Sequence, residues 1–341
     1  MRHFIAYSRL QRATLAAALT FMLAGAGAGQ AHAAGSAAPP DVVTLPSGLN
    51  LGLSSFYDGF TPVQPGTVAL VDYFKFEHLD EITNQSGHAS SVFNNPRINA
   101  EINVLQAIWV SPVQFAGGVL GFTVLEPIVN IDSHFDGPGV ILHNNGLGFG
   151  DTIFGPYFQS LPVISGGRPV FSYRLEFDTI APTGAFDSRR DLNQGSGFWS
   201  IIPYFAFTAL PTPELEISAR IHYLYNFETS RAANPPPIPG FEFVNGQAGQ
   251  ATWINFASSY AVAPWVSVGV NGFYLKQLTN DTVNGTSLPG TRKEELYLGP
   301  GMHFPFDGTN ANILNVNAYF PVETKGVALG PQITAQFIHV F

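Results

Sequence analysis

Alternation along residues 214–227 is the feature that most constrains the fold of this chain. The odd positions are apolar or aromatic, and most of the even positions are polar or charged, including Glu216, Arg220 and His222. Successive side chains on a β-strand point to opposite faces, so this stretch predicts a strand with one apolar and one polar face. At about 3.4 Å per residue it spans roughly 45 Å. That length is unusual in a soluble domain and suits a tilted strand that crosses a membrane and extends beyond it.

The start of the chain has the pattern of a secretory signal peptide, which we assign to residues 1–33. Arg2, Arg9 and Arg12 form a basic start, an apolar run follows at 13–23, and Ala31-His32-Ala33 supplies small residues for cleavage near Ala33. The alternative is a retained membrane anchor, but the apolar run is shorter than the roughly 20 residues that a spanning helix needs. We therefore expect an exported protein.

Composition then selects the kind of membrane protein. Charged residues make up 11% of the chain, against about 25% in soluble domains. After the signal no apolar run approaches the roughly 18 residues of a spanning helix. A closed β-barrel is the other structure that satisfies every backbone group in lipid.

The 24 acidic residues outnumber the 15 basic ones, which argues against a nucleic-acid partner. The chain has no cysteine, so neither disulfides nor lipid attachment through a thiol is expected.

Alternating runs recur along the chain and predict an all-β fold: a single antiparallel transmembrane β-barrel of about twelve strands over residues 66–341, in the bacterial outer membrane. Residues 34–65 are expected to form an N-terminal linker and entry segment on the periplasmic side. The expected strands are 66–77, 98–109, 117–130, 147–160, 168–182, 197–210, 214–227, 250–262, 265–279, 291–304, 312–323 and 329–341.

The connections support this prediction. Long polar connections at 78–97, 131–146, 183–196, 228–249 and 280–290 alternate with short ones at 110–116, 161–167, 211–213, 263–264 and 305–311. Outer-membrane barrels have long extracellular loops and short periplasmic turns. The connection at 324–328 is short where a loop is expected.

Two features of the predicted strands do not fit the pattern cleanly. The faces of the strands near 66–77 and 117–130 cannot be assigned, because their alternation is ambiguous. Four prolines, Pro127, Pro156, Pro203 and Pro300, fall inside predicted strands, where each removes a hydrogen-bond donor from the sheet. Either bulges or displaced strand ends are expected there.

The C-terminus carries a further signal. Ile333, Ala335, Phe337, His339 and Phe341 share one parity, and the chain ends on an aromatic residue. This ending resembles the one that outer-membrane barrels present to their assembly machinery, although His339 stands where an apolar residue is usual. We expect the barrel-assembly machinery as a partner through Phe341, and outer-membrane lipids around the barrel.

Five short motifs, most of them containing glycine, follow one another along the chain: Gly148-Phe149-Gly150-Asp151, Gly155-Pro156, Pro182-Thr183-Gly184, Gly197-Phe198-Trp199 and Leu298-Gly299-Pro300. With these motifs the chain resembles the outer-membrane family named for phenol degradation by the meta pathway, from about Leu45 to Phe341. The resemblance implies a passive channel for small hydrophobic or aromatic compounds. It does not imply that the protein breaks down phenol.

The polar faces of the strands supply the candidate site. We expect eight residues to line the lumen and a possible substrate path: Glu101, Asp151, Arg174, Glu176, Asp178, Glu216, Arg220 and His222. These charges form either a conduction path or ion pairs that hold the barrel and plug its centre. Twelve strands lie between small filled barrels and wide porins, so a narrow or partly closed pore is expected.

Function therefore has three candidates. A channel for uptake is the first, a structural or surface-interaction barrel with a sealed lumen is the second, and an outer-membrane lipid-modifying enzyme is the third. The enzyme depends on His88-Ala89-Ser90, which lies in a polar loop rather than on a lipid-facing strand. We predict no enzymatic activity, no catalytic residue, no cofactor and no metal site.

Overall fold

The computed structural model describes residues 42–235, 241–306 and 311–341, all of which fall within one unit, Ala38–Phe341. The predicted signal peptide and its cleavage site near Ala33 lie outside these residues. The elements within them are strands, and none is a helix of the length and apolarity that would cross a bilayer.

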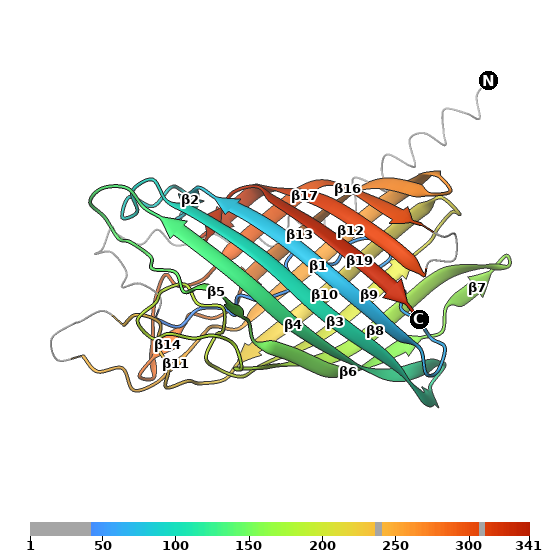
Figure 1. The fold of residues 1–341 in the computed structure, drawn as a ribbon, viewed down its shortest axis with the longest axis horizontal. Helices are drawn as coiled ribbons and strands as arrows, with labels where there is room; N and C mark the ends of the chain where they lie inside the picture. Colours follow the sequence, from blue (N-terminus) through green and yellow to red (C-terminus); the bar gives the residue numbers. More distant parts are fainter. Residues whose placement is uncertain (1–41, 236–240, 307–310) are drawn as a thin grey trace, which may run out of the picture. The chain divides into compact units, whose positions relative to one another are not determined.

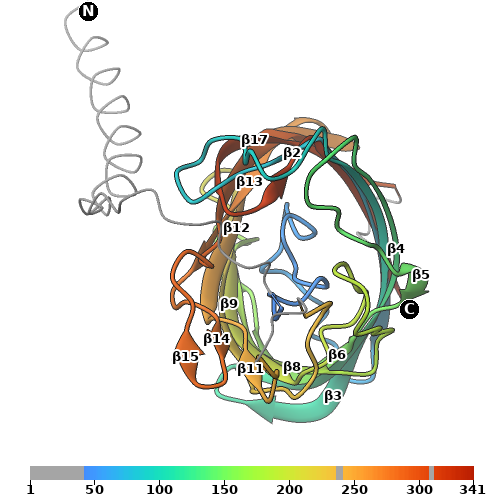
Figure 2. The ribbon, with the colours of Figure 1, turned by 90° about the vertical axis from the view of Figure 1, so that its left-hand side faces the viewer.

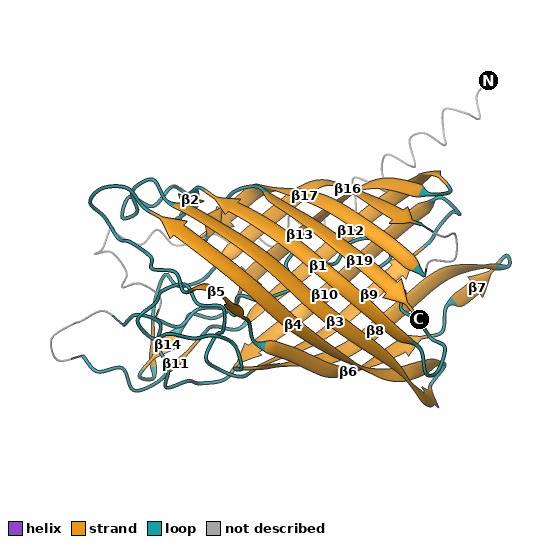
Figure 3. Cartoon of the chain, viewed as in Figure 1, coloured by secondary structure: helices purple, strands orange, loops and turns teal. Residues whose placement is uncertain are grey.

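Twelve long strands form a closed antiparallel barrel, which confirms the predicted fold (Figure 1 and Figure 3). Consecutive strands pair with one another, and β1 (Val68–Leu79) closes the barrel by pairing with β19 (Gln332–Val340). The strands between them are β3 (Arg97–Phe115), β4 (Gly118–His134), β6 (Thr152–Ser160), β8 (Arg168–Ala181), β9 (Ser200–Ala209), β10 (Leu215–Asn226), β12 (Ala251–Ala263), β13 (Val266–Gln277), β16 (Glu294–Pro305) and β17 (Asn312–Lys325).

Long and short connections lie at opposite ends of the barrel, which we call the long-loop end and the short-turn end. The predicted strand at 147–160 is divided into β5 (Gly146–Phe149) and β6, and the β3–β4 hairpin is longer than predicted, with its turn at Ala116-Gly117. Both turn residues have positive φ, 47° and 79°, as a two-residue hairpin turn requires. Smaller pairings decorate the connections: β2 (Glu81–Ile82) with β18 (Ala328–Leu329), β7 (Val163–Ser165) with β8, and β11 (Gly246–Gln247), β14 (Thr282–Val283) and β15 (Thr286–Ser287) in a separate sheet.

The four prolines are accommodated by gaps in the pairing on one side of each strand. Pro127 lies where the partner of β4 changes from β6 to β5. Pro156 falls in a gap of the β6–β8 register, Pro203 in a gap of β9–β10, and Pro300 in a gap of β16–β17. Because proline has no N–H to donate, the ladder loses pairing there without the barrel opening along its length.

Side chains on β9 and β10 alternate as the sequence predicts. On β10 the side chains of Glu216, Ser218 and His222 are buried inside the barrel, whereas Ile217 and Ile221 are exposed on its outer face. The outer face carries many further exposed apolar residues, among them Trp109, Phe122, Leu175, Phe177, Val270, Phe320 and Phe337. An apolar exterior of this kind suits contact with lipid.

The wall formed by β1, β3 and β4 carries apolar side chains on both faces. Its inner face is largely apolar, with Val71, Ile102, Val104 and Val129 packed in one cluster around Leu53. The outer face of β1 carries Asp72, and that of β3 carries Asn103, whose Nδ2 donates to Asp72 Oδ1 over 2.5 Å. The faces of β1 and β4 are therefore ambiguous in the sequence because apolar side chains lie on both sides of this wall.

Candidate functional site

Residues 42–66, which we call the plug, pass through the lumen of the barrel (Figure 2). Val42 and Val43 pack with Phe198 and Ala232 at the long-loop end. At the other end of the plug, Gly66 donates to the carbonyl of Val110, close to the β3–β4 turn. The prediction of a linker on the periplasmic side is therefore wrong for the described part of 34–65, because this segment has an inner wall on which to bury its leucines and aromatic residues.

The plug is held by side chains of the wall rather than by pairing with a strand. Buried backbone groups need hydrogen-bond partners, and in the absence of a sheet neighbour the wall supplies them from its polar inner face. These bonds come from many strands: Trp253 Nε1 and Asn255 Nδ2 to Asn50 O (both 2.9 Å), Tyr319 OH to Gly52 O (2.9 Å), Gln159 Nε2 to Gly59 O (2.9 Å), and Gly59 N to Thr208 Oγ1 (2.9 Å).

An ion pair joins the plug to β10 near the middle of the lumen. Arg220 donates through Nε to Asp58 Oδ2 over 2.7 Å, and its Nη2 donates to the other carboxylate oxygen. Both side chains are buried, with 11% and 7% of their surface exposed. The guanidinium also lies over the ring of Tyr204, 4.6 Å from its centroid. Arg220 therefore faces the lumen, and its partner is a residue of the plug.

A second ion pair lies on β8. Arg174 and Glu176 point inward and contact each other, and both are buried. Arg174 also donates through Nη1 to Thr61 Oγ1 of the plug over 3.1 Å and lies 3.9 Å from the ring centroid of Tyr157. This pair and Arg220–Asp58 lie near each other, on strands separated only by β9.

Glu216 and His222 also face inward from β10. Glu216 accepts hydrogen bonds from the backbone N–H of Tyr57 in the plug (3.0 Å) and from Ser259 Oγ (2.9 Å). His222 is stacked on Trp253 with the ring centroids 4.2 Å apart. Its Nδ1 is buried without a protein partner among the described residues. The polar face of β10 thus holds the plug through Glu216 as well as Arg220, and His222 lines a small space beside it.

Asp178 and Asp151 differ in their surroundings. Asp178 is buried on the inner face of β8, and no described residue makes a hydrogen bond to its Oδ1. Asp151 lies in the break between β5 and β6, where its carboxylate accepts from the backbone N–H groups of Gly184 (2.9 Å) and Ser196 (2.7 Å). Asp151 therefore anchors the connection between β8 and β9 instead of lining a path.

Glu101 is not in the lumen, and that prediction is wrong. It is exposed on the outer face of β3, where Asn130 Nδ2 is 3.4 Å from its Oε2. The prediction places apolar residues toward lipid, but on β3 the apolar side chains of Ala100, Ile102 and Val104 point into the barrel. Packing against Leu53 of the plug makes an apolar inner face favourable there.

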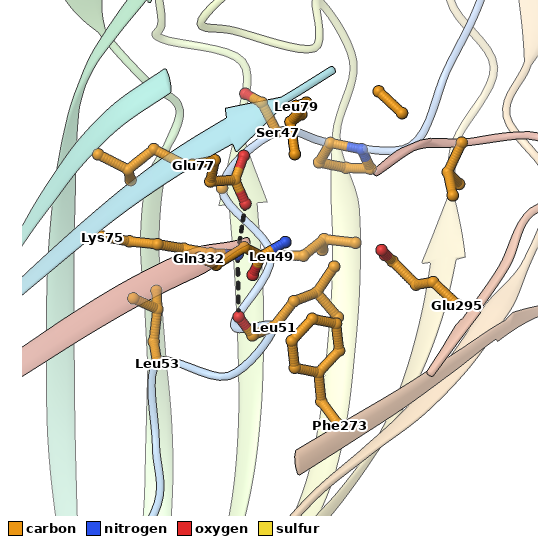
Figure 4. A pocket seen from close by; sticks show the side chains of 15 residues that line it. Ser47, Leu49, Leu51, Leu53, Lys75, Glu77, Leu79, Phe273, Glu295 and Gln332 are labelled. Carbon is orange, nitrogen blue, oxygen red and sulfur yellow. Dashed lines mark hydrogen bonds and ion pairs between the residues drawn. The ribbon is translucent and has the colours of Figure 1, made fainter. Parts of the chain in front are cut away.

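Two cavities remain beside the plug. The larger, of about 200 Å³, lies between Leu49, Leu51 and Leu53 of the plug and the wall residues Lys75 and Glu295 (Figure 4). The smaller, of about 40 Å³, is bordered by the charged and aromatic side chains that point inward from the wall: Tyr73, Glu176, Asp178, Tyr204, Arg220, His222 and Trp253. Gly48 and Leu53 line both cavities. The two cavities therefore meet the plug at the same residues but are lined by different parts of the wall.

Sequence reasoning missed four charged residues that contribute to this lumen. Asp58 is the only charged residue in 42–66, and a lone charge in an apolar segment is a signal for a buried partner. Lys75 and Glu77 belong to a strand whose faces could not be assigned. Glu295 lies near the start of the predicted strand 291–304, next to Glu294, so parity alone did not single it out. Within the described residues no cluster of side chains has the composition of a metal site.

The His88-Ala89-Ser90 stretch lies in the exposed connection that follows β2. Ala89 forms an isolated bridge with Thr83, and Asn84 N donates to His88 O over 2.8 Å. The stretch is thus folded onto its own loop.

A closed twelve-stranded barrel with an apolar exterior and a polar interior filled by its own N-terminal segment defines an outer-membrane β-barrel protein. The family model described as "Putative MetA-pathway of phenol degradation" matches residues 80–337, and the chain belongs to this family. No curated protein matches the sequence.

Barrels of this kind occur among solved structures. An outer membrane channel from Pseudomonas putida F1 is similar with a TM-score of 0.66 at 14% identity, over 82% of this chain and 97% of that one. The β domain of the Bordetella autotransporter Brka aligns over 81% of this chain and 99% of that one, at 11% identity and a TM-score of 0.43.

Proposed function

We propose that this protein is a passive channel of the bacterial outer membrane for small hydrophobic or aromatic compounds. The observation that carries the proposal is the pair of cavities beside the plug, which share Gly48 and Leu53. An apolar solute could enter the larger cavity from the long-loop end and pass toward the middle along the leucines of the plug. The family, whose description refers to phenol degradation, further supports the substrate class.

Passage through the middle requires the plug to shift. The plug is bound by hydrogen bonds to single side chains and by one ion pair, so its contacts with the wall are individually worth about 1 kcal/mol, apart from the charged pair. A ladder of strand pairing would have to break cooperatively, whereas these contacts can exchange one at a time. Export with cleavage near Ala33 and assembly through Phe341 belong to the same proposal.

Planar-bilayer conductance tests it. Folded protein should raise the conductance above that of a protein-free bilayer, because the cavities beside the plug provide a path once the plug shifts. Folding is checked on a gel, where the unboiled barrel should migrate differently from the boiled form. Absence of any flux or conductance from correctly folded protein would contradict the proposal.

A sealed structural or surface-interaction barrel is the second candidate. The Arg174–Glu176 and Arg220–Asp58 pairs together with the plug fill the middle of the lumen, which favours closure. The same conductance measurement decides between the two, since a sealed barrel does not raise the conductance.

A further inference from the structure

The larger cavity has an apolar body and a charged rim. Leu49, Leu51 and Leu53 of the plug face Ile102 and Phe273 of the wall across it. Figure 4 shows Lys75 and Glu77 on one side and Glu295 on the other, with the leucines and Phe273 between them. At about 200 Å³ the cavity exceeds the space that a single water needs, and it suits a small organic molecule.

The charges in this cavity are not balanced. Lys75 already has partners: its Nζ forms an ion pair with Glu77 Oε1 at 2.6 Å and donates a hydrogen bond to Leu51 O over 3.1 Å. Glu295 has no such partner: among the described residues, none donates a hydrogen bond to its carboxylate or forms an ion pair with it. Lys293, two residues away, donates to Thr44. The lining of the cavity therefore holds one lysine and two glutamates, and Lys293 lies near enough to Glu295 to act on it electrostatically without forming an ion pair with it among the described contacts.

A further acceptor lies in the same lining. Gln332 is 3% exposed, and its Oε1 is buried without a hydrogen-bond partner among the described residues. Leaving a buried acceptor without a hydrogen bond is unfavourable, and leaving a carboxylate without a partner is more so. A ligand that supplies both a positive charge and N–H donors would relieve both deficits.

We propose that this cavity binds a small apolar molecule that carries a protonated amine, with Glu295 as its counter-ion. Leu49, Leu51 and Phe273 contact the apolar body of the ligand, and Gln332 accepts a hydrogen bond from the ammonium group. A carboxylate ligand of the same size is disfavoured, because Lys75 is occupied by Glu77 and two glutamates would repel the anion. The assignment rests on the proposed channel and narrows its substrates to amines among the small aromatic compounds.

Calorimetric titration of the full-length folded barrel in detergent tests the assignment, with benzylamine, benzyl alcohol and benzoate as probes of similar size. Benzylamine should bind saturably, and benzoate at least tenfold more weakly. Glu295→Gln should weaken benzylamine about tenfold and leave benzyl alcohol unchanged. Glu295→Asp, which keeps the charge but shortens the side chain, should give an intermediate affinity.

Glu214→Gln is the matched control, since Glu214 is an exposed glutamate in the short turn before β10, and it should bind benzylamine like the unaltered protein. Each variant is first checked for folding by its gel mobility. Equal affinities for benzylamine and benzoate, or an unchanged benzylamine affinity in folded Glu295→Gln, would overturn the assignment.

Planar-bilayer conductance separates this assignment from the channel itself. Conductance without selective benzylamine binding would remove the amine site and leave the channel. Selective benzylamine binding without conductance would support the site and remove the channel.

Discussion

Asp58 is the residue on which the closure of the lumen depends most directly. Its carboxylate neutralises Arg220, and both groups are buried. Breaking such a pair by removing one partner typically costs about 3–5 kcal/mol, because the other charge stays buried without compensation. Asp58→Asn should therefore lower the free energy of unfolding by roughly that amount and raise the conductance in planar bilayers, since the plug loses its charged contact.

Two further variants make this prediction specific. Asp58→Asn combined with Arg220→Met should recover most of the lost stability, because no buried charge is left unpaired. Asp132→Asn, on the exposed outer face of β4, should change neither stability nor conductance. A single Asp58→Asn variant as stable as the unaltered protein would show that the ion pair does not hold the plug.

Asp187, in the connection between β8 and β9, is expected to titrate unusually low. The side-chain and backbone N–H groups of Arg189 donate to its carboxylate and lower its pKa to about 2. The folded pKa lies below the usual value of about 3.9, so any stabilisation from this contact is complete above pH 4 and is lost as the pH falls toward 2. An NMR titration should show this midpoint, and Arg189→Ala should return it toward the usual value. A midpoint near 4 in the unaltered protein would contradict the contact.

Whether a side chain points to lipid or to the lumen could be predicted from the sequence where the two faces of a strand differ in polarity, as on β10. They were not predictable on β3, where Glu101 lies outside and Ile102 inside. The apolar partner of Ile102 is Leu53, a residue distant in sequence. Alternation alone identifies two faces but does not say which of them meets the plug.

At the scale of elements, the plug fits the wall most closely at Gly59. A β-carbon there would clash with the backbone N of Thr208, whereas one at Gly48 would make an ordinary contact of 3.6 Å with Pro127. Gly59→Ala should therefore push the plug from β9, break the Gly59 N to Thr208 Oγ1 bond, and lower stability by about 1–3 kcal/mol. Conductance should increase at the same time.

Gly48→Ala is the matched control for stability and should leave the thermal unfolding temperature nearly unchanged. Unfolding is monitored by circular dichroism, and the conductance of Gly59→Ala is compared with that of the unaltered protein by single-channel recording. If Gly59→Ala unfolds like Gly48→Ala and conducts like the unaltered protein, the close fit of the plug at Gly59 has no consequence for closure.

The strands could be predicted from the sequence much better than the plug. Each strand carries its own period of two, and turn residues mark its ends, so ranges such as 265–279 and 312–323 lie close to β13 and β17. Residues 42–66 have no period, because no strand pairs with them and their contacts come from all around the lumen. Their place inside the barrel follows from long-range packing, which a local pattern does not encode.

For the whole molecule, we propose that Phe341 governs assembly. It is 69% exposed, and its backbone N–H donates to Val68 O over 3.0 Å, next to the β1–β19 closure. Phe341→Ala should reduce the amount of folded barrel in the outer membrane several-fold. The barrel that does assemble should keep its gel mobility, because few contacts inside the wall are lost.

Phe306→Ala removes another exposed phenylalanine, 61% exposed, which directly follows β16. It should leave the assembled amount unchanged. The measurement is the quantity of heat-modifiable protein in outer-membrane fractions, and equal losses in both variants would argue against a terminal signal.

The continuity of the plug with β1 sets the order in which this molecule can be built. Gly66 is one residue from the first strand, and that strand is sealed by the last one to be synthesised. If the wall closed first, 25 residues would have to be pulled lengthwise through a finished tube, and threading of this kind is rare in proteins. The strands are therefore expected to assemble around a plug that is already in place. The plug would then act first as a template for closing the barrel and afterwards as the segment that occupies its lumen.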